Sequence, residues 1–152
     1  MRPVSAVGAT YRLETPMGSA FITINEDEFG EPLEIFLNVG RAGSDVGAMA
    51  EALGRSLSAA FRFRGNLSSK ERVTEIVHQL AGIGGRRSVG FGVQKVRSLP
   101  DAVATALSMH YKVVMNGNGK VQVDSEKLVE VKDEISHPEG ISSAYSNGSN
   151  GN

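Results

Sequence analysis

The stretch Phe36-Leu37-Asn38-Val39-Gly40-Arg41-Ala42-Gly43-Ser44-Asp45 decides the fold of this chain. It predicts a buried strand that continues through a glycine-rich turn into a helix capped by Ser44. Such a layout directs free backbone N–H groups and the Arg41 guanidinium at one point, which is how proteins bind anions. The spacing matches neither a Walker A motif nor a dinucleotide fingerprint. Gly40, Arg41, Gly43 and Ser44 are therefore candidate anion- or nucleotide-binding residues, and the alternative is a structural turn whose glycines supply positive φ.

Two further strands are expected before this stretch. Residues 11–14 and 19–25 are rich in β-branched and aromatic side chains, and Pro16-Met17-Gly18 forms the turn of a hairpin between them. Residues 33–39 alternate in character, which predicts a third strand with one apolar face.

The helix that begins after Ser44 has an apolar stripe at helical spacing. The stripe consists of Val46, Met49, Ala50, Leu53, Leu57, Ala60 and Phe61. Gly47 and Gly54 lie inside this helix, although each costs about 1 kcal/mol relative to alanine. We expect another stretch of backbone to pack closely against one of them.

Two more helices follow. Ser68 and Glu71 form the pattern of a capping box, so a second helix should begin there and stop at Gly82. A third should begin near Ser98, with Pro100 in its first turn, and continue to about residue 111. The expected fold is α+β: a three-stranded, mainly antiparallel sheet covered by two or three helices.

The 152 residues and 40% hydrophobic content suit a single domain with a tail. The expected organisation is an N-terminal arm over 1–10, the α+β domain over 11–111, a hairpin or linker over 112–135 and a disordered polar tail over 136–152.

Composition excludes several kinds of chemistry. The chain has no cysteine, so it cannot form disulfides, thiolate metal sites, thiol nucleophiles or thiyl radicals. Its three histidines lack metal-ligand spacing, and we expect neither a metal site nor a catalytic residue. The balance of 16 basic and 17 acidic side chains argues against nucleic-acid binding. No segment has the ~20 apolar residues of a membrane span, and no secretory signal is evident, so a cytoplasmic location is expected.

A second candidate site is the glycine-rich segment 82–95. Gly84, Gly85, Arg86 and Arg87 could wrap a phosphate or contact a partner's acidic surface. Long loops of this kind tend to be functional. The alternative is a flexible connector with solvated cations.

Five segments occur in an order that resembles a known family. They are residues 15–27 (TPMGSAFITINED), 33–45 (LEIFLNVGRAGSD), 50–58 (AEALGRSLS), 77–85 (VHQLAGIGG) and 98–107 (SLPDAVATAL). Together they resemble the TSCPD domain, the C-terminal accessory region of adenosylcobalamin-dependent (class II) ribonucleotide reductases. The resemblance covers about residues 12–111.

The resemblance implies a role in deoxyribonucleotide biosynthesis and hence in DNA replication. It implies a partner, the catalytic chain of a class II reductase, which would hold adenosylcobalamin and the reacting cysteines; this chain would bind no cofactor itself. Arg97-Ser98-Leu99-Pro100-Asp101 occupies the place of the name-giving motif, with Leu99 where a cysteine often stands. The cysteine-pair tail of reductases is replaced by SNGSNGN. The chain alone should therefore not be an enzyme.

Two functions are kept open. The first is a non-catalytic accessory or interaction module of such a reductase, or a stand-alone relative of it. The second is an independent regulatory domain that binds a nucleotide or another phosphate through its glycine-rich loops. The sequence does not decide whether the chain forms a homo-oligomer.

Overall fold

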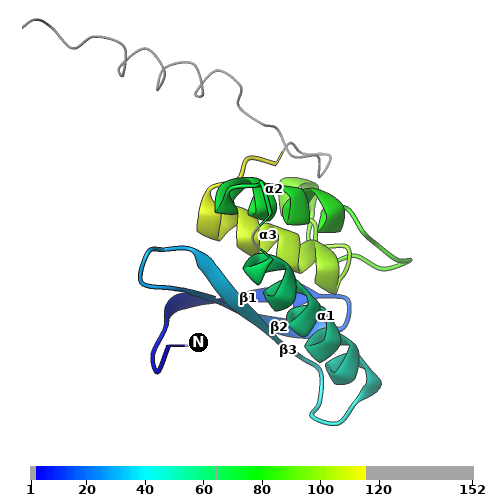
Figure 1. Ribbon diagram of the computed structural model, residues 1–152. Coiled ribbons are helices and arrows are strands. Elements are labelled where there is room, and N and C mark those ends of the chain that lie inside the picture. Colours follow the sequence, from blue (N-terminus) through cyan, green and yellow to red (C-terminus); the bar gives the residue numbers. More distant parts are fainter. Residues whose placement is uncertain (1–2, 64, 116–152) are drawn as a thin grey trace, which may run out of the picture.

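The computed structural model describes residues 3–63 and 65–115. Three antiparallel strands in the order β1-β2-β3 form one sheet, and three α-helices follow, which confirms the predicted α+β fold (Figure 1). The elements are β1 (Val7–Thr15), β2 (Gly18–Glu26), β3 (Pro32–Val39), α1 (Asp45–Arg62), α2 (Ser69–Leu80), the short 3-10 helix η1 (Gly92–Gln94) and α3 (Leu99–Tyr111). The predicted organisation after residue 115 lies outside the described residues.

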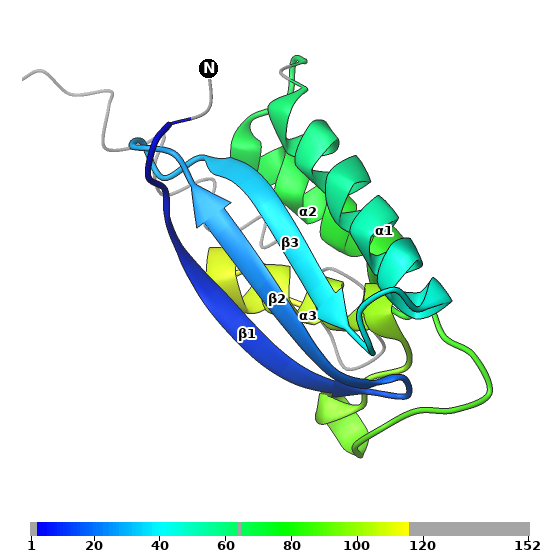
Figure 2. The ribbon, with the colours of Figure 1, turned by 90° about the horizontal axis from the view of Figure 1, so that it is seen from below.

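The helices cover one face of the sheet, and the opposite face carries no helix among residues 3–115 (Figure 2). α1 lies along β3, α3 packs against β1 and β2, and α2 packs mainly against α3. Ala20, Ile22 and Ile24 from β2 are fully buried beneath the helices, as are Val103, Ala106 and Leu107 from α3. The core therefore lies between the sheet and the helices, with β2 and α3 at its centre.

The first strand is longer than the sequence predicted. β1 begins at Val7, so it includes residues that were expected in the N-terminal arm. Val7 pairs with Glu26 and Gly8 pairs with Asn25. A Cβ at Gly8 would collide with the carbonyl oxygen of Ile24. Glycine has a low strand propensity. Gly8 permits this close pairing, but it also made the start of β1 hard to predict from the sequence.

The buried stripe of α1 differs from the predicted one. Met49 is 73% exposed, so its place in the stripe was wrong, whereas Ala50, Leu57 and Phe61 are buried as expected. The buried face also includes Gly54, where an added Cβ would lie 3.2 Å from the carbonyl oxygen of Ile35. This confirms the expected close approach of a second backbone, and it turns the helix so that Met49 points away.

Ser58 closes the outer edge of β3. Its hydroxyl accepts a hydrogen bond from the Ile35 N–H at 2.9 Å and lies 3.2 Å from the Ile35 carbonyl oxygen, to which it donates. Edge strands otherwise present unpaired backbone groups. Ser58 is 8% exposed, so α1 satisfies both groups inside the protein.

We expect Ser58→Ala to lower the free energy of unfolding by roughly 2–4 kcal/mol, because it leaves a buried N–H and a buried carbonyl without partners. Chemical denaturation would measure the change. Ser56→Ala is the matched control, since Ser56 is exposed on the same helix and should change stability by no more than about 0.5 kcal/mol. Equal stabilities for the two variants would contradict this role of Ser58.

The caps of the later helices match their predictions. The Ser68 side chain and the Glu71 side chain form the expected capping box of α2. Hydrogen bonds from the Ser68 hydroxyl and N–H hold the pKa of Glu71 below its ordinary value. Ser98 caps α3, and Pro100 lies in the first turn.

Candidate functional site

The β3–α1 turn is built by Gly40, Gly43 and Ser44. Gly40 has φ +73° and Gly43 has φ +77°, a backbone conformation that glycine adopts at least cost. The Ser44 hydroxyl donates to the Arg41 carbonyl oxygen at 2.7 Å and accepts from the Gly47 N–H at 3.1 Å. These three residues therefore have turn and capping roles. Arg41 itself is exposed, and anion binding there stays a prediction.

The second candidate segment is a folded loop rather than a loose connector. Val89 and Val96 form an antiparallel bridge through two backbone hydrogen bonds of 2.8 Å. Gly90 has φ +83°, and an added Cβ would lie 2.6 Å from the Gln94 carbonyl oxygen. The bridge and the 3-10 turn η1 together hold the tip of the loop. Between the loop and β1 is a pocket of about 420 Å³ that Leu13 and Met109 help to line.

Asp101 fastens both ends of this loop. One carboxylate oxygen accepts from the Gly82 N–H at 2.7 Å, and the other accepts from the Arg97 N–H at 2.8 Å. Asp101 is 6% exposed. Ser98 adds a hydrogen bond from its hydroxyl to the carbonyl oxygen of Ile83. The segment 97–101, which occupies the place of the family motif, therefore closes the base of the loop, and Leu99 within it is buried.

Gly84, Gly85, Arg86 and Arg87 lie on the first half of the loop. A Cβ at Gly84 would lie 2.7 Å from the Cβ of Arg97, so the two arms of the loop touch there. Gly85 has open space around it. Arg86 and Arg87 are exposed.

The structure does not join the two candidate segments. Among residues 3–63 and 65–115, no hydrogen bond or ion pair links the β3–α1 turn to the glycine-rich loop. None of the eight candidate residues lines the loop pocket or the larger pocket described next. Binding of a nucleotide or phosphate by these residues stays a prediction.

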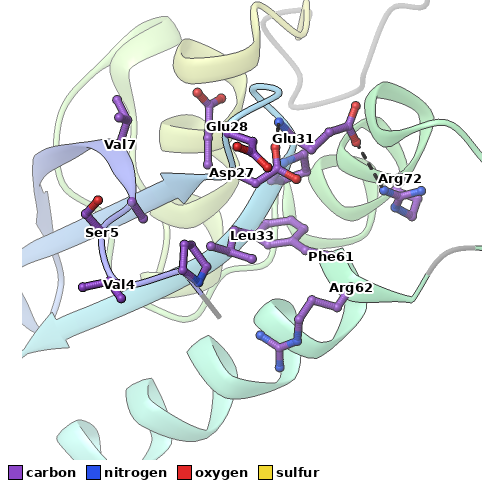
Figure 3. A pocket seen from close by; sticks show the side chains of 14 residues that line it. Val4, Ser5, Val7, Asp27, Glu28, Glu31, Leu33, Phe61, Arg62 and Arg72 are labelled. Carbon is purple, nitrogen blue, oxygen red and sulfur yellow. Dashed lines mark hydrogen bonds and ion pairs between the residues drawn. The ribbon is translucent and has the colours of Figure 1, made fainter. Parts of the chain in front are cut away.

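A larger pocket lies at the opposite end of the sheet, where the sequence predicted none. It has a volume of about 650 Å³, is open to solvent, and is lined by the N-terminal arm, the β2–β3 turn and the end of α1 (Figure 3). Leu33 and Phe61 lie between these segments, and Val4 and Val7 line the pocket on the side of the N-terminal arm. The run of carboxylates at the β2–β3 turn is visible in the sequence. The pocket behind that turn is not, because it depends on tertiary packing.

Carboxylates dominate the rim of this pocket. Glu26, Asp27, Glu28 and Glu31 line it, against the two cations Arg62 and Arg72. Arg72 is occupied: its Nη1 donates to the Leu67 carbonyl oxygen at 2.7 Å, and its Nη2 lies 3.8 Å from a Glu31 carboxylate oxygen. Among the other rim carboxylates, Glu26 pairs with His110, and Asp27 accepts from the Phe29 and Glu31 N–H groups. Four carboxylates against two cations leave the rim with a net negative charge.

A half-buried polar cluster links β1 and the end of β2 to α3. The His110 ring lies between two partners: Nδ1 is 2.9 Å from the Tyr11 hydroxyl and Nε2 is 3.1 Å from the Glu26 carboxylate. Burial raises the pKa of the neighbouring Tyr111 hydroxyl well above its ordinary value, and the Glu26 carboxylate adds to the rise. The Tyr111 hydroxyl oxygen has no partner in hydrogen-bond geometry within the described part of the chain.

The Tyr111 environment predicts a loss of stability in alkali. Above about pH 10 the unfolded chain releases the tyrosine proton while the folded chain keeps it, so the free energy of unfolding falls as pH rises. Tyr111→Phe should flatten this fall in denaturation curves recorded from about pH 9 to about pH 11. If the free energy of unfolding falls equally steeply with pH in the wild type and in Tyr111→Phe, Tyr111 is not the group responsible.

Within the described ranges, no three His, Asp or Glu side chains gather in a geometry that could hold a metal ion. In the same residues, no helix has the length and apolarity to cross a membrane.

Comparison with protein families identifies the domain. The TSCPD domain matches residues 2–111, which is most of the chain and includes every strand and helix described above. No curated protein and no solved structure matches this chain.

Proposed function

Because the chain belongs to the TSCPD domain family, we propose that it is a non-catalytic accessory module of an adenosylcobalamin-dependent ribonucleotide reductase, or a stand-alone relative of one. The observation that carries the proposal is the match over residues 2–111, which spans the whole α+β domain rather than a short motif. The proposed role places the chain in the cytoplasm, in deoxyribonucleotide synthesis for DNA replication.

The chemistry of the chain supports a docking role. Radical reduction of a ribonucleotide in this enzyme class needs cysteines, and this chain has none. Residues 97–101, which occupy the place of the family motif, have a structural role in this chain. Asp101 and Ser98 hold the glycine-rich loop, and the buried Leu99 packs into the core. In this proposal the catalytic chain binds adenosylcobalamin, and the module contributes surfaces for that chain.

We expect the purified chain to produce no deoxynucleotide from any ribonucleotide, with or without adenosylcobalamin. Chromatographic assay of the products measures this directly. Detection of product above a no-protein control would contradict a non-catalytic role.

Binding to the catalytic chain is the positive test. The probe is the purified adenosylcobalamin-dependent reductase of the source organism, immobilised for interferometry and also assayed for turnover with added module. The matched control is a reductase that uses no cobalamin. Saturable binding to the first enzyme and not to the second supports the proposal. Absence of binding and of any effect on turnover at the highest soluble concentration overturns it.

A further inference from the structure

Charge is segregated along this chain to an unusual degree. Residues 13–40 contain six acidic side chains and no Lys or Arg, whereas residues 76–100 contain four Lys or Arg and no acidic side chain. The acidic β2–β3 turn lies with Val7 at the start of β1, and the basic loop lies beside Leu13 and Glu14 near its end. The two views of the ribbon agree that these segments lie at opposite ends of the sheet (Figures 1 and 2).

The basic end carries an aromatic ring on a folded tip. Phe91 is 94% exposed and lies between Gly90 and Gly92, both with positive φ. The Gln94 N–H donates to the Phe91 carbonyl oxygen at 3.2 Å, and the Val89–Val96 bridge lies directly behind. A turn that holds a phenyl ring in water forgoes the gain of burying it, so this ring is available as an apolar anchor for a partner.

The acidic end offers the complementary shape and charge. Its pocket of about 650 Å³ combines apolar surface from Val4, Val7 and Leu33 with the carboxylate rim. Glu28 is exposed on that rim, and its carboxylate points outward beside Asp27 (Figure 3). The Phe91 ring is complementary to the apolar surface of such a pocket. The cations that flank it, Arg86, Arg87 and Lys95, are complementary to the negative charge of the rim.

We infer that the glycine-rich loop of one copy of this chain docks into the acidic pocket of a second copy, with Phe91 against the apolar surface and the loop cations against the carboxylate rim. The loop cannot fill the pocket of its own chain, because Val7 and Leu13 are separated by roughly 20 Å of extended strand. An antiparallel pair related by a two-fold axis makes the contact twice, so the smallest closed assembly is a dimer. This inference does not depend on the link to ribonucleotide reduction.

The first test measures the mass of the full chain by sedimentation equilibrium over a wide concentration range. We expect two loop tips in two pockets to form a small interface compared with the ~800 Å² per partner of a standard one, so association should appear only at high concentration. Between 50 mM and 500 mM salt the affinity should fall by about tenfold or more, because the exposed charges are screened. A monomer at every concentration and at low salt overturns the inference.

Variants then locate the contact. Phe91→Ser should abolish association, and Met49→Ser is the matched control, because Met49 is also a largely exposed apolar residue but lies on α1. Arg86→Glu and Glu28→Lys should each weaken association. Lys70→Glu reverses an exposed charge on α2 and should leave it unchanged. Circular dichroism confirms that each variant is folded. Association that survives in folded Phe91→Ser overturns the inference.

A charge exchange provides the decisive test. The Arg86→Glu/Arg87→Glu chain has an acidic loop facing an acidic pocket, and the Glu28→Lys chain has a basic loop facing a pocket that has gained a cation. Each should associate poorly alone. In a mixture the wild-type basic loop meets the wild-type acidic pocket, and the acidic loop meets a rim on which carboxylates and cations balance. Repulsion is thereby removed from both contacts, so an equimolar mixture should recover association. A mixture that stays as monomeric as its components overturns the inference.

Discussion

Replacement of Asp101 by alanine is expected to lower the free energy of unfolding by about 3–5 kcal/mol, since hydrogen bonds to a charged group contribute about 1.5–3 kcal/mol each. The carboxylate accepts from two backbone N–H groups, those of Gly82 and Arg97, and it is almost fully buried. Alanine leaves both donors without their partner. Chemical denaturation measures the loss, and amide exchange at Gly82 and Arg97 should accelerate.

Asp45→Ala is the matched control. Asp45 also lies in the first turn of a helix but is exposed, so its loss removes only an interaction with the helix dipole of about 0.3–1 kcal/mol. Asp101→Asn keeps one acceptor oxygen and should fall between wild type and Asp101→Ala. If Asp101→Ala costs no more than Asp45→Ala, the carboxylate does not fasten the loop.

The second large effect is expected at Phe61. Its side chain is 1% exposed and belongs to the core beneath the sheet while also lining the acidic pocket. Truncation to alanine removes the buried ring and leaves a cavity, so Phe61→Ala should cost about 3–5 kcal/mol. Thermal and chemical denaturation would both show the loss.

Phe63 supplies the control for that substitution. It is the same residue type two positions further along the chain, but it is 75% exposed. Phe63→Ala should change stability by no more than about 0.5 kcal/mol. Comparable losses in the two variants would show that Phe61 does not anchor the end of α1.

Local signals predicted most of the fold. The Ser68–Glu71 capping box, the Ser98 cap and the strand over residues 33–39 were each predictable from a few neighbouring residues, and all three are present in the structure. The alternation of β3 is broken at Glu34, which is 6% exposed although it was predicted on the polar face. Met49 shows what local sequence patterns cannot predict. Helical spacing alone makes it part of a stripe, but the contact between Gly54 and the Ile35 carbonyl oxygen decides which side of α1 faces the sheet.

The functional surfaces were less predictable. Gly84 was predicted as a possible phosphate contact, and the structure shows that it also lies where the two arms of the loop touch; Gly90 lies under the Gln94 carbonyl. The sequence could not reveal these approaches, because they depend on which distant segments meet. The acidic pocket is a similar case, since residues from the arm, the β2–β3 turn and α1 become neighbours only in the folded chain.

The single carboxylate at the base of the glycine-rich loop has a consequence for how this protein can vary. Asp101 fixes both Gly82 and Arg97. The fold of the sheet and helices therefore depends little on how many residues connect those two points. Loop-closure entropy grows slowly, by only about 0.6 kcal/mol for each doubling of length. Residues can therefore be inserted or lost between Gly85 and Ser88 while the sheet and helices stay intact. The length of this loop can therefore change without any change in the domain that carries it.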